Sequence, residues 1–299
     1  MLTRLVTSIP TSDDHPVIAD WYPSAQADGS ASPHVVVMCH GFKGHRRWGF
    51  IPMVAMRLSV EGFSTLVLDF SHNGRVPMDG TARLSQDDTF VSPELFRANT
   101  IARELEDLHG TLAWMRGAGA DVLGIPTDAR FGLWGHSRGG LVAVLEALED
   151  PSVAALVTWS ALSKPQPYSE RQRKAWREKG ELAFTDYPSG TSLALGVELL
   201  DDLEANKSRY NVGERAQALT MPHLAVHGEH DPTVPVAQSY QFYDTPSIKA
   251  DKKLLRLLTG HTYGYDEGRI ASDALENATK ATVEWFDTYL RDNAPAQRG

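Results

Sequence analysis

A short serine motif flanked by glycines is the strongest chemical signal in the chain. Ser137 stands in the run Gly135-His136-Ser137-Arg138-Gly139, which has the Gly-x-Ser-x-Gly pattern of a nucleophile elbow. The pattern alone is weak, because about one unrelated chain of this length in ten contains it by chance. Here a strand-like run precedes the serine and an apolar helical pattern follows it, as an elbow requires. The sequence therefore predicts a nucleophilic Ser137, with a serine that only caps a helix as the alternative.

A serine hydroxyl is a poor nucleophile at neutral pH and needs a base that an acid holds in place. After such an elbow the acid comes first along the chain and the base second. Asp231 follows the apolar run 223–227, and His261 follows the apolar run 253–258. Because both stand just past the ends of predicted strands, we predict Asp231 as the acid and His261 as the base.

Other residues compete for these roles. Glu229 and Asp266 are the rival acids, whereas His230 is adjacent to Asp231 and is poorly placed to face both it and the serine. His40 and His136 raise the question of a metal. No carboxylate pair at helical spacing lies beside them, and a single cysteine cannot form a thiolate cluster, so no metal site is predicted.

Acyl transfer also needs N–H donors aimed at the developing oxyanion. One predicted donor is the backbone amide of Arg138, directly after the serine. The other is the amide of Phe42, since Gly41 allows a sharp turn in the loop 40–44; the alternative is that this loop serves only as a turn. Asp69, at the end of a predicted strand, is expected to brace the loop rather than to take part in chemistry.

The elements that must position these residues alternate along the chain, as is typical of a parallel sheet covered by helices. Apolar, β-branched runs predict strands at 35–39, 64–70, 128–134, 153–158, 223–227 and 253–258. Helical patterns at 50–60, 94–116, 141–148, 236–243 and 272–290 lie between or after them. A polar loop spans 71–92. We predict one α/β domain over residues 1–299, with a mostly parallel central sheet flanked by helices.

The alternation stops between residues 163 and 211, where the sequence is polar and irregular. Excursions of this length usually serve a function, so we predict a small cap or lid inserted in the domain. Trp159, Trp176 and Tyr187 are predicted to line the substrate pocket, although each is also suited to packing. Residues 164–179 include six basic and two acidic side chains, either a solvated helix face or a rim that attracts an anionic ester.

The composition excludes several classes of function. A formal net charge of −9 argues against a nucleic-acid binder, which normally has a basic face. The single cysteine, Cys39, excludes an intrachain disulfide, and its apolar neighbours predict a buried strand residue. No signal-peptide pattern and no run of about 18 apolar residues occurs, so we expect a cytoplasmic protein without membrane contact. A homodimer is left open.

Together these segments resemble the feruloyl and cinnamoyl esterase-like branch of the α/β-hydrolases, related to dienelactone hydrolases and to the prolyl-oligopeptidase catalytic domain. The resemblance runs from about residue 15 to the end. The segments that carry it are His40-Gly41-Phe42, Gly135-His136-Ser137-Arg138-Gly139-Gly140, His227-Gly228-Glu229-His230-Asp231-Pro232-Thr233-Val234-Pro235 and Gly260-His261-Thr262. Dienelactone hydrolases proper have a cysteine where this chain has Ser137.

The resemblance implies the α/β-hydrolase fold and hydrolysis of a small-molecule carboxylic ester through an acyl-enzyme, without a cofactor. A polar cap that lacks a broad apolar face favours short-chain or aromatic, cinnamoyl-type acids. Two alternatives stay open: carbon–carbon bond or peptide and amide hydrolysis by the same three residues, and a non-catalytic ligand-binding protein that keeps the fold.

Overall fold

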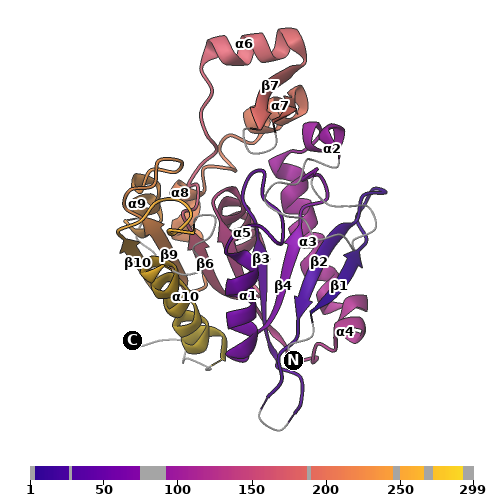
Figure 1. Ribbon diagram of the computed structural model, residues 1–299, viewed down its shortest axis with the longest axis vertical. Helices are drawn as coiled ribbons and strands as arrows, with labels where there is room; N and C mark the ends of the chain where they lie inside the picture. Colours follow the sequence, from indigo (N-terminus) through magenta and orange to yellow (C-terminus); the bar gives the residue numbers. More distant parts are fainter. Residues whose placement is uncertain are drawn as a thin grey trace.

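The computed structural model describes residues 4–26, 29–74, 92–186, 190–244, 250–265 and 272–291 of the 299-residue chain. Its centre is an eight-stranded sheet (Figure 1) in the order β1-β2-β4-β3-β5-β6-β9-β10. β2 pairs antiparallel with both of its neighbours, and all the remaining pairs are parallel. The strands of this sheet are β1 Leu5–Ile9, β2 Val17–Tyr22, β3 His34–Cys39, β4 Ser64–Asp69, β5 Arg130–His136, β6 Val153–Trp159, β9 His223–Gly228 and β10 Lys252–Leu257. The predicted parallel sheet is confirmed.

Helices cover both faces of the sheet (Figure 1). Successive side chains of a strand point to opposite faces, and β3 illustrates the result, since Val35 and Val36 belong to two separate hydrophobic clusters. The cluster with Val35 contains α3 and α5, and the cluster with Val36 contains α1 and α10. Burial on both faces explains why these strands read as continuous apolar runs. The covering helices are α1 Ile51–Val60, α3 Ile101–Arg116, α5 Arg138–Glu149, α9 Ala237–Tyr243 and α10 Asp273–Phe286, and η2 Asp287–Arg291 continues α10.

The single helix predicted over 94–116 is wrong, because the structure divides it into α2 (Pro93–Arg97) and α3. The Thr100 side chain caps α3 by accepting the Arg103 N–H at 3.1 Å. A carboxylate oxygen of Asp202, distant in sequence, accepts the amides of residues 101 and 102 at 3.0 and 3.1 Å. These acceptors satisfy the first amides of α3, so the helix begins anew there. After α3, the chain forms α4 (Ala118–Leu123) before β5.

The segment predicted to be polar and irregular, residues 163–211, forms helices and strands over most of its described residues, and we refer to it as the cap segment. It contains α6 (Glu170–Lys179), the antiparallel hairpin of β7 (Glu181–Asp186) with β8 (Thr191–Gly196), and α7 (Val197–Ala205). Figure 1 shows α6, β7 and α7 beyond the end of the sheet, on the side of α2. α8 (Val212–Arg215) and η1 (Ala216–Ala218) then lead back to β9. The polar loop predicted at 71–92 lies for the most part outside the described residues.

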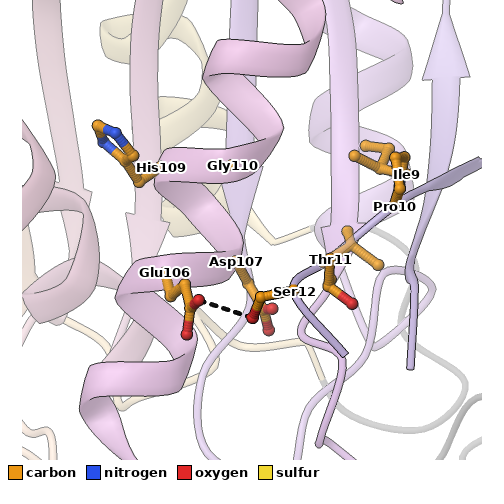
Figure 2. Close-up of a pocket in the computed structure, with 9 residues that line it drawn as sticks. Ile9, Pro10, Thr11, Ser12, Glu106, Asp107, His109 and Gly110 are labelled. Carbon is orange, nitrogen blue, oxygen red and sulfur yellow. Dashed lines mark hydrogen bonds between the residues drawn. The ribbon is translucent and has the colours of Figure 1, made fainter. Parts of the chain in front are cut away.

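A cavity of about 260 Å³ lies between α3 and the turn that joins β1 to β2 (Figure 2). None of the predicted site residues lines it. Asp107 is one of its lining residues, and one of its carboxylate oxygens accepts the Ser71 N–H at 2.8 Å. Burial, together with nearby Glu104, raises the pKa of Asp107 to about 7.

This raised pKa predicts a pH-dependent stability that Asp107→Asn removes. Between the ordinary pKa of 3.8 and about 7 the folded protein binds more protons at Asp107 than the unfolded chain does. The contribution of this group to stability is therefore greatest at acidic pH and falls as pH rises toward 7, by at most ~1.4 kcal/mol per pH unit. Asparagine cannot titrate and still accepts the Ser71 N–H. Denaturant titrations between pH 5 and 7.5 should show a steeper loss of stability in the wild type.

Glu106→Gln is the matched control, because Glu106 is an exposed neighbour of Asp107 on α3 and lines the same cavity. This variant should follow the wild-type pH profile. A constant difference in unfolding free energy between wild type and Asp107→Asn across this pH range would contradict the prediction.

Candidate active site

Ser137 occupies the sharp turn between β5 and α5. Its φ is 57° and its ψ is −121°, a conformation that costs energy for a residue other than glycine. Hydrogen bonds hold the turn, since Ser137 N–H donates to the Trp159 carbonyl at 2.9 Å and its own carbonyl accepts the Gly140 N–H at 3.0 Å. A Cβ at Gly135 or Gly139 would overlap neighbouring backbone. The local geometry is that of a nucleophile elbow.

The loop after β3 lies directly against this turn. A Cβ built on Gly41 would be 2.9 Å from the Ser137 Cβ. Among the described residues, no group accepts the backbone N–H of Phe42. The Arg138 N–H is the first amide of α5 and likewise has no acceptor within the described part of the chain, as expected at a helix N-terminus. Both predicted oxyanion donors are therefore unengaged amides close to Ser137.

His40 fixes the peptide group that carries the Phe42 amide. Its Nδ1–H donates to the Gly41 carbonyl at 2.9 Å, and its Nε2 accepts the Phe70 N–H at 3.3 Å. Burial lowers the pKa of His40, so the ring stays neutral with its proton on Nδ1. Because a trans peptide directs C=O and N–H to opposite sides, anchoring the Gly41 carbonyl also sets the direction of the Phe42 N–H.

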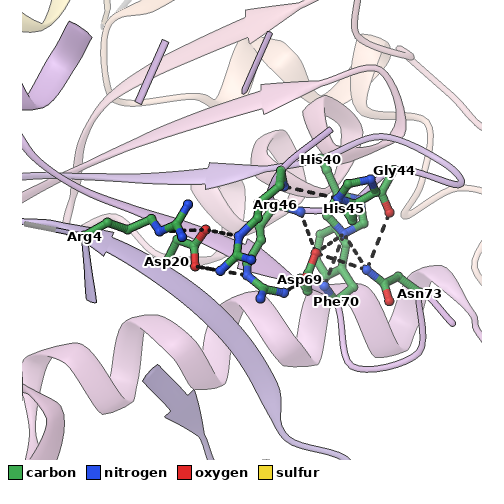
Figure 3. A network of polar contacts seen from close by, with 10 residues as sticks. Arg4, Asp20, His40, Gly44, His45, Arg46, Asp69, Phe70 and Asn73 are labelled. Carbon is green, nitrogen blue, oxygen red and sulfur yellow. Dashed lines mark hydrogen bonds and ion pairs between the residues drawn. The ribbon is translucent and has the colours of Figure 1, made fainter. Parts of the chain in front are cut away.

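Asp69 supports the loop 40–44 and the residues after it, as predicted (Figure 3). It accepts the Arg46 backbone N–H at 2.5 Å and the Asn73 side chain at 3.2 Å, and it also contacts the Arg46 guanidinium. Arg46 is fully buried and bonds to Asp20 as well, at 3.1 Å. A buried charge of this kind persists only when it is paired and hydrogen-bonded. The network therefore anchors the chain just after the loop 40–44.

The predicted acid and base are in contact. His261 Nδ1–H donates to Asp231 Oδ2 at 2.7 Å, which leaves Nε2 of the imidazole as the basic nitrogen. Asp231 Oδ1 accepts the backbone amides of Thr233 and Val234 at 2.9 and 2.8 Å. Burial alone would raise the pKa of Asp231, but the hydrogen bonds from His227 and His261 outweigh it and hold this pKa well below its usual value. The carboxylate is therefore ionised and oriented toward the imidazole.

His227 is a supporting residue for which no role was predicted. Its Nε2–H donates to the Val234 carbonyl at 2.8 Å and lies 3.5 Å from Asp231 Oδ2, and its Nδ1 contacts the Ser239 hydroxyl. It therefore ties the end of β9 to the loop that carries the acid. Its position, four residues before an acid at the end of a strand, is the signal that would have indicated this role.

His136 links the base to the elbow. The described contacts include no hydrogen bond between Ser137 Oγ and His261, and in ligand-free enzymes this bond is often long. His136 Nε2–H donates to the His261 carbonyl at 3.1 Å, and the two ring centroids are 4.6 Å apart. Burial and the neighbouring His261 hold the pKa of His136 well below its usual value. His261 is thus held against the residue that precedes Ser137, by a neutral ring that would not repel a protonated imidazole.

We expect His136→Phe to lower kcat by about tenfold with little change in KM, because a base that moves by a fraction of an ångström transfers protons less efficiently. Phenylalanine keeps the packing against Trp48 and Phe50 but lacks the N–H donor. His136→Gln, which keeps a donor, should retain more of the activity. Steady-state kinetics test this, and equal kcat values for the two variants would contradict it.

The rival acids do not replace Asp231 in the described structure. Glu229 pairs with Arg256 at 3.3 Å, and Asp266 lies outside the described residues. The predicted buried position of Cys39 is confirmed, because its side chain is fully buried in β3 and burial raises its pKa.

The structure does not support the predicted pocket residues. The prediction that Trp159 lines the pocket is wrong, because this side chain is fully buried and its indole N–H donates to Thr282 of α10 at 3.0 Å. Trp176 is also fully buried, against Tyr168 in the core of the cap segment. Both tryptophans are therefore packing residues. A large aromatic side chain suits a hydrophobic core as well as a ligand pocket, and only the tertiary structure decides between the two. Tyr187 lies outside the described residues.

Three of the six basic side chains at 164–179 pair with acidic neighbours in the described structure. Arg177 pairs with Asp201 at 2.7 Å and with Glu204 at 2.6 Å on α7, and Lys174 pairs with Glu178 at 3.9 Å. This arrangement favours a solvated helix face over a rim that attracts anions.

No group of three potential ligands among His, Cys, Asp and Glu that could hold a metal ion occurs in the described ranges. No helix in the part of the chain described is long and apolar enough to span a membrane.

The sheet order, the elbow after β5 and the hydrogen-bonded Asp231 and His261 after β9 and β10 define the α/β-hydrolase fold. Solved structures agree. A complex of DcsB with its substrate analogue matches with a TM-score of 0.70 at 16% identity, covering 97% of this chain and 100% of the other. Est1E from Butyrivibrio proteoclasticus matches with a TM-score of 0.62 at 18% identity, covering 94% of this chain and 97% of the other. A dienelactone hydrolase from Anabaena variabilis matches with a TM-score of 0.59 at 17% identity, covering 97% and 99%.

No protein-family model matches the chain, and no curated protein matches it in sequence. The likeness to the solved structures therefore confirms the fold, and with it the predicted resemblance to esterases and dienelactone hydrolases, at the level of the architecture.

Proposed function

We propose that the protein is a serine carboxylester hydrolase. The observation that carries this proposal is the Asp231–His261 pair, with its 2.7 Å hydrogen bond, held by His136 beside a serine in an elbow turn. Nucleophile, base, acid and two unengaged amides are the parts that acyl transfer through a serine requires.

In the proposed reaction, Ser137 Oγ attacks the ester carbonyl while His261 Nε2 takes its proton. The resulting oxyanion accepts hydrogen bonds from the Phe42 and Arg138 amides. The tetrahedral intermediate collapses as imidazolium protonates the leaving alcohol, and the acyl group stays on the serine. Water, deprotonated by His261, attacks the acyl-enzyme; collapse of the second intermediate returns the proton to Ser137 and releases the acid. Asp231 stays ionised and stabilises the imidazolium in both halves.

The substrate class is proposed as esters of short-chain or aromatic acids, with the cap segment as a lid over the site. Two observations support this choice. The cap segment presents charged helices paired with each other and buries its tryptophan. Its described residues include no exposed large hydrophobic side chain, whereas long acyl chains require a broad apolar face. Among the solved structures of the same fold, Est1E is described with ferulic acid bound.

Two experiments together test the proposal. A fluorophosphonate should add one phosphonyl group per chain, and peptide mapping should locate it on Ser137. A panel of p-nitrophenyl esters from acetyl to long-chain acids, extended with methyl cinnamates, amides and carbon–carbon bond substrates, should show turnover of short or aromatic esters. Labelling without turnover of any ester would favour an amidase or a carbon–carbon hydrolase. A chain that neither labels nor turns over a substrate would instead be a ligand-binding protein of this fold.

A further inference from the structure

The residue after Phe42 has an unusual backbone conformation. Lys43 has a φ of 60°, in the left-handed region that favours glycine. The turn that contains it is closed by the Gly44 N–H, which donates to the Gly41 carbonyl at 2.9 Å. A lysine at such a position costs about 1 kcal/mol or more relative to glycine. The reason for a lysine must therefore lie in what its side chain contacts.

The Lys43 ammonium pairs with Asp186 across 143 positions of sequence. Its Nζ lies 2.8 Å from Asp186 Oδ1, and only 1% of the Asp186 side chain is exposed. Asp186 is the last residue of β7 in the cap segment. A buried carboxylate is stable only when donors or cations compensate it, so this ion pair joins the cap hairpin firmly to the loop at the elbow.

The side chain of Phe42 contacts the same strand of the cap segment. Its ring centroid is 6.2 Å from that of Phe184 in β7 and 5.5 Å from that of Phe96 in α2. On the other side, the Arg138 guanidinium lies 5.5 Å from the centre of the Phe42 ring. Two consecutive residues of the loop, Phe42 and Lys43, are thus both held by one cap strand, which fixes the loop from outside as His40 fixes it from inside.

We propose that Lys43 and Asp186 are positioning residues that couple the closed cap to an assembled oxyanion hole. The proposal rests on the proposed function for its catalytic consequence. With the ion pair intact, β7 holds the turn in the conformation in which the Phe42 N–H is directed toward the oxyanion of the bound ester. When β7 moves away, the strained turn at Lys43 is released and this donor is lost. The enzyme is then fully active only with its cap docked.

Kinetic measurements on Lys43→Met, Asp186→Asn and the double variant test the coupling. Each single variant should lower kcat by about tenfold, since a partly displaced oxyanion donor costs less than its removal. The double variant should be no slower than either single one, because both changes break the same contact. Additive losses would overturn the proposal. Lys174→Met and Glu178→Gln, an exposed pair on α6 of the same cap segment, are matched controls and should retain wild-type kcat.

A second readout separates the oxyanion hole from general loss of cap structure. A trifluoromethyl ketone that forms a hemiketal oxyanion on Ser137 should bind about tenfold more weakly to both single variants, while the affinity for the carboxylic acid product should change less than twofold. Equal losses for the two ligands would mean that the ion pair serves substrate binding or folding alone, and would overturn the proposal.

A third readout does not depend on activity. Amide hydrogen exchange of residues 41–44 should be faster in both single variants than in the wild type, whereas exchange in the Lys174→Met control should be unchanged. If the wild type hydrolyses no ester, the proposed function fails, and this exchange experiment still decides whether the cap holds the loop. Unchanged exchange at residues 41–44 in both variants would overturn the coupling itself.

Discussion

Replacing Ser137 with alanine should reduce ester hydrolysis by about 10⁴- to 10⁶-fold without unfolding the protein. Removing the nucleophile of a serine hydrolase leaves only the contribution of the oxyanion donors and substrate binding. The fold should persist, because the hydrogen bonds of the turn use the backbone of Ser137 and alanine is the smallest change at a position with positive φ. Initial rates on a short p-nitrophenyl ester, together with thermal unfolding, measure both effects.

Ser152→Ala is the matched control for this experiment. Ser152 is exposed, near the end of α5 that is remote from Ser137, and its hydroxyl bonds only locally, to Asp150 at 2.6 Å. The control should keep wild-type activity and fluorophosphonate labelling. A Ser137→Ala variant that turns over short esters at the wild-type rate would rule out the proposed mechanism.

Asp231→Asn should lower kcat by about 10³- to 10⁴-fold, because it disrupts the tautomer of the base. Oδ2 accepts the His261 Nδ1–H at 2.7 Å and faces the His227 Nε2–H at 3.5 Å, while Oδ1 accepts two backbone amides. All four partners are donors. In either orientation an asparagine presents its own NH₂ to two of them, so the substitution also destabilises the fold.

The depressed pKa of Asp231 gives this variant a signature in stability. A carboxyl whose pKa is lowered on folding stabilises the protein above its unfolded pKa of 3.8 and loses that effect as pH falls. The wild type should therefore lose more stability than Asp231→Asn when the pH is lowered from 5 to 3, as denaturant titrations will show. Glu229→Gln, at the rival acid that pairs with Arg256, should retain activity within about twofold. A larger activity loss in Glu229→Gln than in Asp231→Asn would contradict the assignment of Asp231 as the acid.

Much of this architecture could be predicted from the order of residues. Five of the six parallel strands carry runs such as Val35–Cys39 that are buried on both faces, and such runs differ clearly from amphipathic helices. The antiparallel strands β1 and β2 were not predicted. β1 lies at the edge of the sheet and is mostly exposed, so its pattern is weak. The division of α2 from α3 was missed because one of the two acceptors that begin α3, Asp202, is a hundred residues away.

Ser137, Asp231 and His261 were predicted because the fold places a nucleophile, an acid and a base just after the ends of particular strands, and strand ends are visible in sequence. The pair Asp231–His261 then follows from β9 and β10 being adjacent and parallel. The pocket could not be predicted in this way. Trp159 and Trp176 have residue types equally suited to a core or a pocket, and both are buried.

By itself the sequence determined the class of fold and predicted which residues would act as nucleophile, acid and base, because these depend on local patterns of burial and on turns of a few residues. The tertiary structure alone decided which residues support them. His136 against the His261 carbonyl and Lys43 paired with Asp186 join segments 125 and 143 positions apart. Contacts of this kind depend on how the layers pack, since no local pattern in the chain records the partner of a buried polar group.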